Sequence, residues 1–317
     1  MLKITNHRRS VASWILIICL LVSLAHTDVR AETVLPLDAA VTKSNVMSLA
    51  RTYDTDGAYL LHPDKKASDY MTWLYGSRRI TDNLNTAVHE MTHDYTFSHA
   101  GSYKSEAIYL GNKKKIIVPY TKIYYTKKMA KSIPKRCRTM RYNTYVANPT
   151  PYLSSNTQGV YGLLNEFSAY SWGMNNTICL FDYYKNFPLE MNTWHNFINA
   201  GANDRLAYAE FKYYILHYIY YAKKHYPKIY KKIMNNKKFR KAYRKTEKRF
   251  AKLVKKYEKD LDQIEKLAAA SQIDAGLRGE FFYINGSGSG VFADEYDVLI
   301  KEISKKKYQK IHKKLLK

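Results

Sequence analysis

The sequence predicts an α+β fold in which helices dominate and strands are few. Apolar residues recur with helical spacing over residues 81–97, and residues 204–270 and 293–316 are strongly helical. Residues 107–118 read as two strands joined at a Gly-Asn turn. Hydrophobic residues make up 46% of the 317-residue chain, with only 13 glycines and 8 prolines, which excludes collagen-like and low-complexity proteins.

Residues 1–31 have the pattern of a secretory signal peptide. Three basic residues precede an apolar run at residues 11–25, and Val29 and Ala31 place small residues before a cleavage site. The apolar run is shorter than the roughly 20 residues that span a bilayer. We therefore expect a secreted protein that is cleaved near Ala31, with an N-terminal membrane anchor as the alternative.

After cleavage the chain would keep two cysteines, Cys137 and Cys179. An oxidising exterior would let them form a disulfide. They could equally be two separate thiols, because the sequence does not fix the distance that a bridge requires.

The chain is strongly basic, with 52 Lys and Arg against 27 Asp and Glu and a formal net charge of +25. For an exported protein this charge favours adhesion to an anionic cell-surface polymer or a membrane surface, and no nucleic-acid partner is expected. Lysine runs are also typical of plain solvated faces, so the charge does not define a function.

The helix at residues 81–97 should begin at a cap formed by Thr81 or Asp82. Its apolar positions fall on one side and predict one buried stripe. They are Leu84, Val88, Met91 and Tyr95.

Further elements follow along the chain. Strand-like sequence occurs near residues 123–125 and 140–146, and a second helix should begin at residues 157–160 and continue past Trp172. Residues 286–290 (GSGSG) read as a flexible linker before the last helix.

The motif that carries chemistry is HExxH at residues 89–93, on the first of these helices. Residues four apart lie about 40° apart around a helix, so His89 and His93 can reach one metal ion. Glu90 can hold a water at that ion and take its proton. The pattern therefore predicts a zinc site with Glu90 as the catalytic base.

On these residues the chain resembles the zincin metallopeptidases, in which the HExxH helix packs beside a mixed sheet. The resemblance implies a small mixed sheet next to this helix and a Zn²⁺ ion that serves peptide-bond hydrolysis. It also implies a zincin-like catalytic region at residues 32–200, with a helical region at residues 201–317 that completes or flanks the cleft.

A catalytic zinc site needs a third protein ligand, and two candidates compete. Glu166 lies on the second helix, in the sequence NExxxY, which resembles the NExxS/A-like setting of the gluzincin Glu and implies a His, His, Glu site. Gluzincins commonly carry an acid four residues later, where this chain has Tyr170, so Tyr170 is expected to support the site or to offer an alternative ligand. His99 has the metzincin spacing, but Thr96 replaces the glycine that turns the metzincin chain. Glu166 is the predicted ligand and His99 the alternative.

The predicted function is that of a secreted zinc metallopeptidase acting on a peptide or protein substrate. The alternative is a cationic surface-binding protein whose zinc site is structural or degenerate. A donor that stabilises the oxyanion is also needed, but 30 tyrosines give no basis for choosing one.

Overall fold

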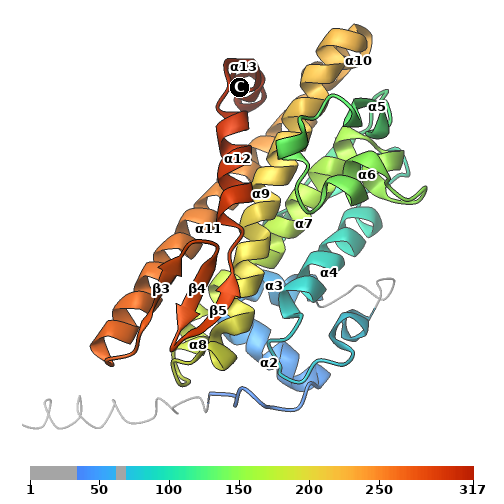
Figure 1. Cartoon of the computed structure of the whole chain (residues 1–317). Coiled ribbons are helices and arrows are strands. Elements are labelled where there is room, and N and C mark those ends of the chain that lie inside the picture. Colours follow the sequence, from blue (N-terminus) through green and yellow to red (C-terminus); the bar gives the residue numbers. More distant parts are fainter. Residues whose placement is uncertain (1–33, 62–68) are drawn as a thin grey trace, which may run out of the picture. The chain divides into compact units, whose positions relative to one another are not determined.

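Three long helices run side by side and organise the molecule (Figure 1): α7 (Val160–Cys179), α9 (Met191–His225) and α11 (Lys237–Ala270). The computed structural model describes residues 34–61 and 69–317, and Pro36–Lys317 form one unit. The predicted signal peptide lies outside the described residues. The α+β class is confirmed, since helices dominate and two small sheets accompany them.

Helix α7 is the innermost element. It is buried along almost its whole length, because α4 (Leu84–Ser98), α9 and α11 all pack on it. A helix that is covered on every side has no solvated face for polar residues. Most polar groups on α7, including Asn165 and Glu166, are therefore held away from water.

Helix α4 carries the HExxH motif and packs on α7. The predicted apolar stripe is confirmed, since Leu84, Val88, Met91 and Tyr95 are all buried. The helix begins at Leu84 and not at the predicted cap. Asp82 instead accepts hydrogen bonds from the backbone N–H groups of Arg78 and Arg79, and Asn83 takes a left-handed backbone conformation with φ 56°.

The predicted hairpin is confirmed. Strands β1 (Ser105–Gly111) and β2 (Lys114–Pro119) pair antiparallel, and β1 packs against α4 and α7. The expected mixed sheet was wrong, because both sheets in the described part of the chain are purely antiparallel. A hairpin needs only a short turn, whereas a parallel pair would need a long crossover that this segment does not supply.

The second sheet comprises β3 (Ala275–Arg278), β4 (Phe281–Ile284) and β5 (Ser287–Gly290), and it contacts α9 and α11. Residues 286–290 are thus not a flexible linker. Gly286 supplies a left-handed turn position with φ 78°, and Ser287–Gly290 then pair with β4.

The strand predicted at residues 140–146 was also wrong. Asn143–Ala147 form a π-helical turn, η3, which follows an anchor at Arg141. The backbone N–H and the guanidinium of Arg141 both bond the carboxylate of Glu210 on α9. This tertiary contact overrides the strand propensity of the Tyr and Val residues in the segment.

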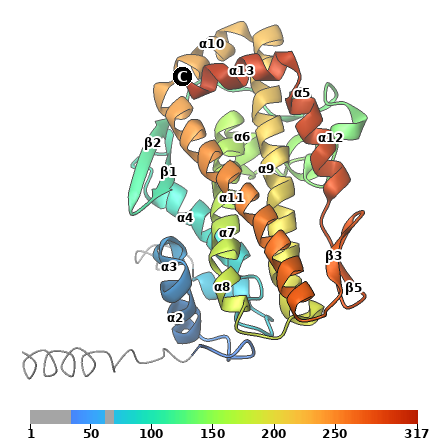
Figure 2. The same ribbon diagram turned by 90° about the vertical axis from the view of Figure 1, so that its left-hand side faces the viewer.

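Helix α9 begins at Met191, so the division expected at residue 200 falls inside a continuous helix. The single helix predicted at the C-terminus is two, α12 (Ala293–Ile303) and α13 (Lys306–Leu316), which pack on α9 and α11 (Figure 2). Within the described residues, no helix combines the length and apolarity needed to cross a membrane. The remaining elements are α2 (Lys43–Tyr53), α3 (Thr55–Leu61), η1 (Tyr70–Leu74), α5 (Lys127–Ala130), η2 (Lys135–Cys137), α6 (Ser154–Thr157), α8 (Phe181–Tyr184) and α10 (Pro227–Asn235).

The two cysteines do not form a disulfide, and both are free. Cys137 lies in η2, where the charged neighbours of its thiol include Glu302 of α12. Cys179 ends α7, where Asn175 donates a hydrogen bond to its sulfur. The second expectation, of separate thiols, is the one that the structure shows.

Candidate metal centre and its cavity

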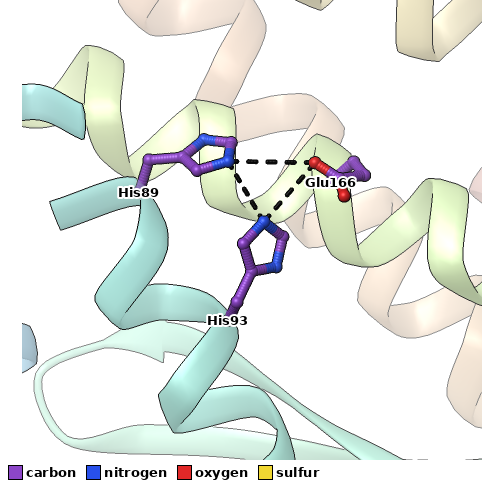
Figure 3. Close-up of side chains that lie close together, drawn as sticks. All are labelled: His89, His93 and Glu166. Atoms are coloured by element: carbon purple, nitrogen blue, oxygen red, sulfur yellow. Dashed lines mark hydrogen bonds and ion pairs between the residues drawn. The ribbon is translucent and has the colours of Figure 1, made fainter. Parts of the chain in front are cut away.

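His89, His93 and Glu166 converge on one point between α4 and α7 (Figure 3). The two Nε2 atoms of the histidines are 3.1 Å apart. Oε2 of Glu166 lies 3.4 Å from Nε2 of His93 and 3.8 Å from Nε2 of His89. Among the described residues, these three form the group of His, Cys, Asp or Glu side chains that could hold a metal ion.

The separations fit a small metal ion. A circle through the three atoms has a radius of about 2.0 Å, which matches the length of a zinc bond to a histidine nitrogen or a carboxylate oxygen. A single ion could therefore contact all three atoms without moving the helices. Two nitrogens and one oxygen are also the donor set that zinc accepts in catalytic sites.

The Glu166 carboxylate provides an independent indication of a cation. Its side chain is only 4% exposed, and within the described residues Oε2 accepts no hydrogen bond. Burying a charged oxygen without a donor is costly unless a cation compensates it. In the metal-free site a protonated His93, 3.4 Å away, supplies that compensation, and a metal ion bound by all three residues would replace it.

Asn165 fixes the orientation of His93. Its Oδ1 lies 3.0 Å from Nδ1 of His93 and accepts the Nδ1 proton, so that loss of the other ring proton leaves the lone pair of Nε2 directed at Glu166 and His89. Metal-binding histidines commonly donate their second N–H to such an acceptor. The adjacent residues Asn165 and Glu166 thus serve the same site from α7.

Without a metal ion, the His93 side chain of this site holds a proton tightly. Burial alone would lower the pKa of His93, but the Glu166 carboxylate outweighs it and raises that pKa to about 9. Burial and the nearby His93 lower the pKa of His89 well below its ordinary value. At neutral pH, His93 is therefore the protonated member of the pair when no metal is bound.

Glu90 faces a cavity of about 320 Å³ beside the three converging residues. The cavity lies among α4, α7 and α9, and His89 forms part of its wall. Glu90 is only partly buried, and burial raises the pKa of its carboxyl. A raised carboxyl pKa suits a group that must accept and later release a proton.

Tyr170 packs on His89 and is not among the three converging residues. Its ring lies edge-on to the His89 ring at 4.3 Å, and the Arg141 guanidinium covers its other side at 4.6 Å. The tyrosine thus holds the imidazole in place by packing, where an acid would do so by a hydrogen bond.

Tyr145 joins the same cavity from the π-helical turn η3. Its hydroxyl is 3.5 Å from that of Tyr170, and burial together with the Glu166 charge raises its pKa. The hydroxyl therefore keeps its proton and can donate it in a hydrogen bond. Single π-helical turns are common at functional sites because they redirect one side chain.

His99 lies at the C-terminal end of α4, away from the converging residues. Its ring stacks on Tyr95 at 3.9 Å, and its Nδ1 lies near the backbone oxygen of Tyr95. Thr96 remains helical and donates its hydroxyl to the Thr92 carbonyl, so the chain makes no turn back towards His93. The structure brings Glu166, and not His99, to the two histidines.

Comparisons with protein-family models, curated proteins and solved structures found no match for this chain.

Sequence reasoning missed three residues at this site: Asn165, Arg141 and Tyr145. The position of Asn165, next to Glu166, was a usable signal, because adjacent residues on a helix can serve the same pocket from two sides. Arg141 and Tyr145 left no signal, since their segment has the local pattern of a strand.

Replacing Glu166 by Ala should weaken zinc binding at least about 100-fold, because it removes a charged oxygen from a three-ligand site. His99→Ala is the matched control and should bind zinc as the unaltered chain does. Calorimetric titration of the metal-free proteins measures both. Zinc lost with His99→Ala and kept with Glu166→Ala would contradict the geometry.

Zinc binding at pH 7 should release about one proton, because His93 is protonated below its metal-free pKa of about 9 and must lose that proton to bind. Apparent affinity should accordingly rise about tenfold per pH unit up to that pKa. Titrations in buffers with different ionisation enthalpies measure the released proton. In Glu166→Gln the release should fall, and equal heats in all buffers for the unaltered chain would refute the expectation.

Proposed function

We propose that this protein is a zinc-dependent peptidase with His89, His93 and Glu166 as metal ligands and Glu90 as general base. The observation that carries the proposal is the convergence of these three side chains at metal-ligand spacing, with His89 on the wall of a cavity that Glu90 also lines. The donor set supports zinc, and the HExxH sequence supports hydrolysis.

The number of ligands favours a catalytic over a structural role. Structural zinc sites are closed by four protein ligands, whereas catalytic sites use three and keep one position open. The described part of the chain offers three such residues, next to a cavity of about 320 Å³. A substrate group or a water could therefore reach the ion from the cavity.

The chemistry then divides between the ion and the chain. A bound zinc ion would polarise the scissile carbonyl and make a water molecule more acidic. The Glu90 carboxylate accepts a proton from the attacking water and passes it to the leaving amine. Its partly buried position on the cavity wall suits both tasks, because the raised pKa makes the proton easy to hold and still transferable.

Tyr145 is the proposed donor to the developing oxyanion. Tyr145 lines the cavity, and its hydroxyl lies 3.5 Å from that of Tyr170 and within the electrostatic influence of Glu166. A donor that is already oriented before the reaction stabilises negative charge most effectively. The π-helical turn holds Tyr145 in that orientation through Arg141 and its pair with Glu210.

Several expectations accompany this proposal. The zincin resemblance, which rests on the HExxH motif and the helix of Glu166, supports a gluzincin-like enzyme, and residues 1–31 support secretion with cleavage near Ala31. The net charge of +25 supports attachment to an anionic surface. The positive charge would then hold the enzyme at the anionic surface, and the site beside the cavity would cleave a peptide or protein substrate.

Glu90→Gln should keep zinc binding within about threefold and lower peptide hydrolysis at least 1,000-fold, because the amide keeps the shape but cannot take a proton. Glu295→Gln, at an exposed position on α12, is the matched control and should retain full activity. The test is zinc content together with cleavage of a mixed peptide library. Equal cleavage by the unaltered chain and Glu90→Gln would exclude the proposed role.

Tyr145→Phe should lower kcat about 100-fold and change KM little, since the lost hydrogen bond forms mainly in the transition state. The measurement is steady-state kinetics on a peptide that the unaltered enzyme cleaves. A larger effect on KM than on kcat would assign the Tyr145 hydroxyl to substrate binding.

A further inference from the structure

The cavity extends beyond the catalytic candidates into a polar region between α4, α7 and α9. Amide side chains dominate this region. They belong to Asn83, Asn85, Asn176, Asn196, Asn199 and Asn203. Several of their N–H groups are in use elsewhere, since Asn196 donates to Asp82 and Asn203 donates to the Asn199 carbonyl.

Asp204 contributes a carboxylate to the same cavity from α9. The residue is 3% exposed, and within the described residues its Oδ2 accepts no hydrogen bond. The positive charge of Arg141 acts on the carboxyl and the Asn85 side chain bonds it, but within the described residues Asp204 forms no ion pair. Asp204 lines the cavity, and its buried Oδ2 is an acceptor that a donor group of a ligand could satisfy.

Asn176 supplies a second unused acceptor. Its amide nitrogen donates to Oδ2 of Asp54 at 3.0 Å, which fixes the orientation of the amide. Its Oδ1 is fully buried and accepts no hydrogen bond within the described residues. Two residues of the cavity lining, Asp204 and Asn176, therefore each carry an acceptor oxygen without a donor.

Arg141 also lines the cavity, but its charge is already compensated. Its guanidinium donates to Oε2 of Glu210 at 2.8 Å, and its backbone N–H donates to Oε1 of the same residue. An anionic ligand would therefore have to compete with Glu210. A cationic ligand could pair with the Asp204 carboxylate directly, because Asp204 forms no ion pair within the described residues, although the charge of Arg141 would oppose it in part.

Asp204 lies near the backbone end of the His89 side chain. A side chain added at Gly173 would meet Oδ2 of Asp204 at 3.5 Å and Cβ of His89 at 3.6 Å. Asp204 and His89 also line the same cavity. A substrate whose peptide bond sits at the metal could therefore extend a neighbouring side chain to Asp204.

We propose that this cavity binds a cationic side chain of the substrate, that of Arg or Lys, with Asp204 and Asn176 as acceptors. The proposal rests on the peptidase function and names its substrate class. Arg and Lys side chains are long, and their N–H groups only donate, so they complement a cavity whose free groups accept. Burial raises the pKa of Asp204 to about 7, and a bound cation would favour its ionised form.

The matched probes are Nα-acetyl-arginine amide and Nα-acetyl-citrulline amide, which have nearly the same shape and differ in charge. The unaltered full-length chain, with and without zinc, should bind the arginine probe at least about 30-fold more tightly. Asp204→Asn should bring the ratio of the two affinities close to one. The control Asp182→Asn alters a carboxylate that is 72% exposed and should keep the full ratio.

Peptides that carry arginine or citrulline next to the cleaved bond test the same preference in catalysis. The unaltered enzyme should show at least about 30-fold higher kcat/KM for the arginine peptides, and Asp204→Asn should reduce that ratio. Thermal melting and zinc content verify that Asp204→Asn is folded. The comparison of probes on the unaltered chain tests the cavity even if that variant does not fold.

The outcomes separate this inference from the peptidase proposal. Equal affinity of the unaltered chain for the two probes overturns the cationic cavity, whether or not peptides are cleaved. A preference that persists in Asp204→Asn overturns the assignment to Asp204. A preference that depends on Asp204, in a chain that cleaves no peptide, supports the cavity and overturns the peptidase function.

Discussion

The close approach of α4 and α7 is the constraint on which the rest of the site depends. At Gly173 a Cβ atom would lie 3.1 Å from the backbone oxygen of Asn85 and 3.6 Å from Cβ of His89. A larger side chain would push the helices apart and separate the histidines from Glu166. The burial of α7 by α9 and α11 on its other sides keeps this approach fixed and excludes water from the carboxylate.

Much of the helical framework and the core of the site could be predicted from the sequence. The HExxH spacing is local, because both imidazoles belong to one helix whose apolar stripe sets its orientation. Glu166 could be chosen over His99 on local grounds as well. Thr96 is suited to continuing a helix and not to reversing it, and α4 continues through Thr96 to Ser98.

The remaining parts depend on contacts between distant segments, which no local pattern records. Tyr145 reaches the cavity because Glu210 anchors Arg141, a contact across 69 residues of sequence. Asp204 appears on a helix with no distinguishing motif, and its importance follows only from the missing hydrogen bond at its Oδ2. The sheet at residues 275–290 likewise depends on pairing between strands, because the glycine-rich segment Ser287–Gly290 is a strand only through its hydrogen bonds with β4.

The two histidines lie far from Glu166 in the sequence, and this separation links metal binding to folding. His93 and the α7 residue Asn165, which it contacts, are separated by 72 positions. An unfolded chain offers the two histidines but cannot hold Glu166 beside them. A metal ion would therefore bind the native state in preference and shift the folding equilibrium towards it. Scarcity of the ion would lower the population of folded molecules as well as their reactivity, so metal supply would also influence how long each chain survives proteolysis.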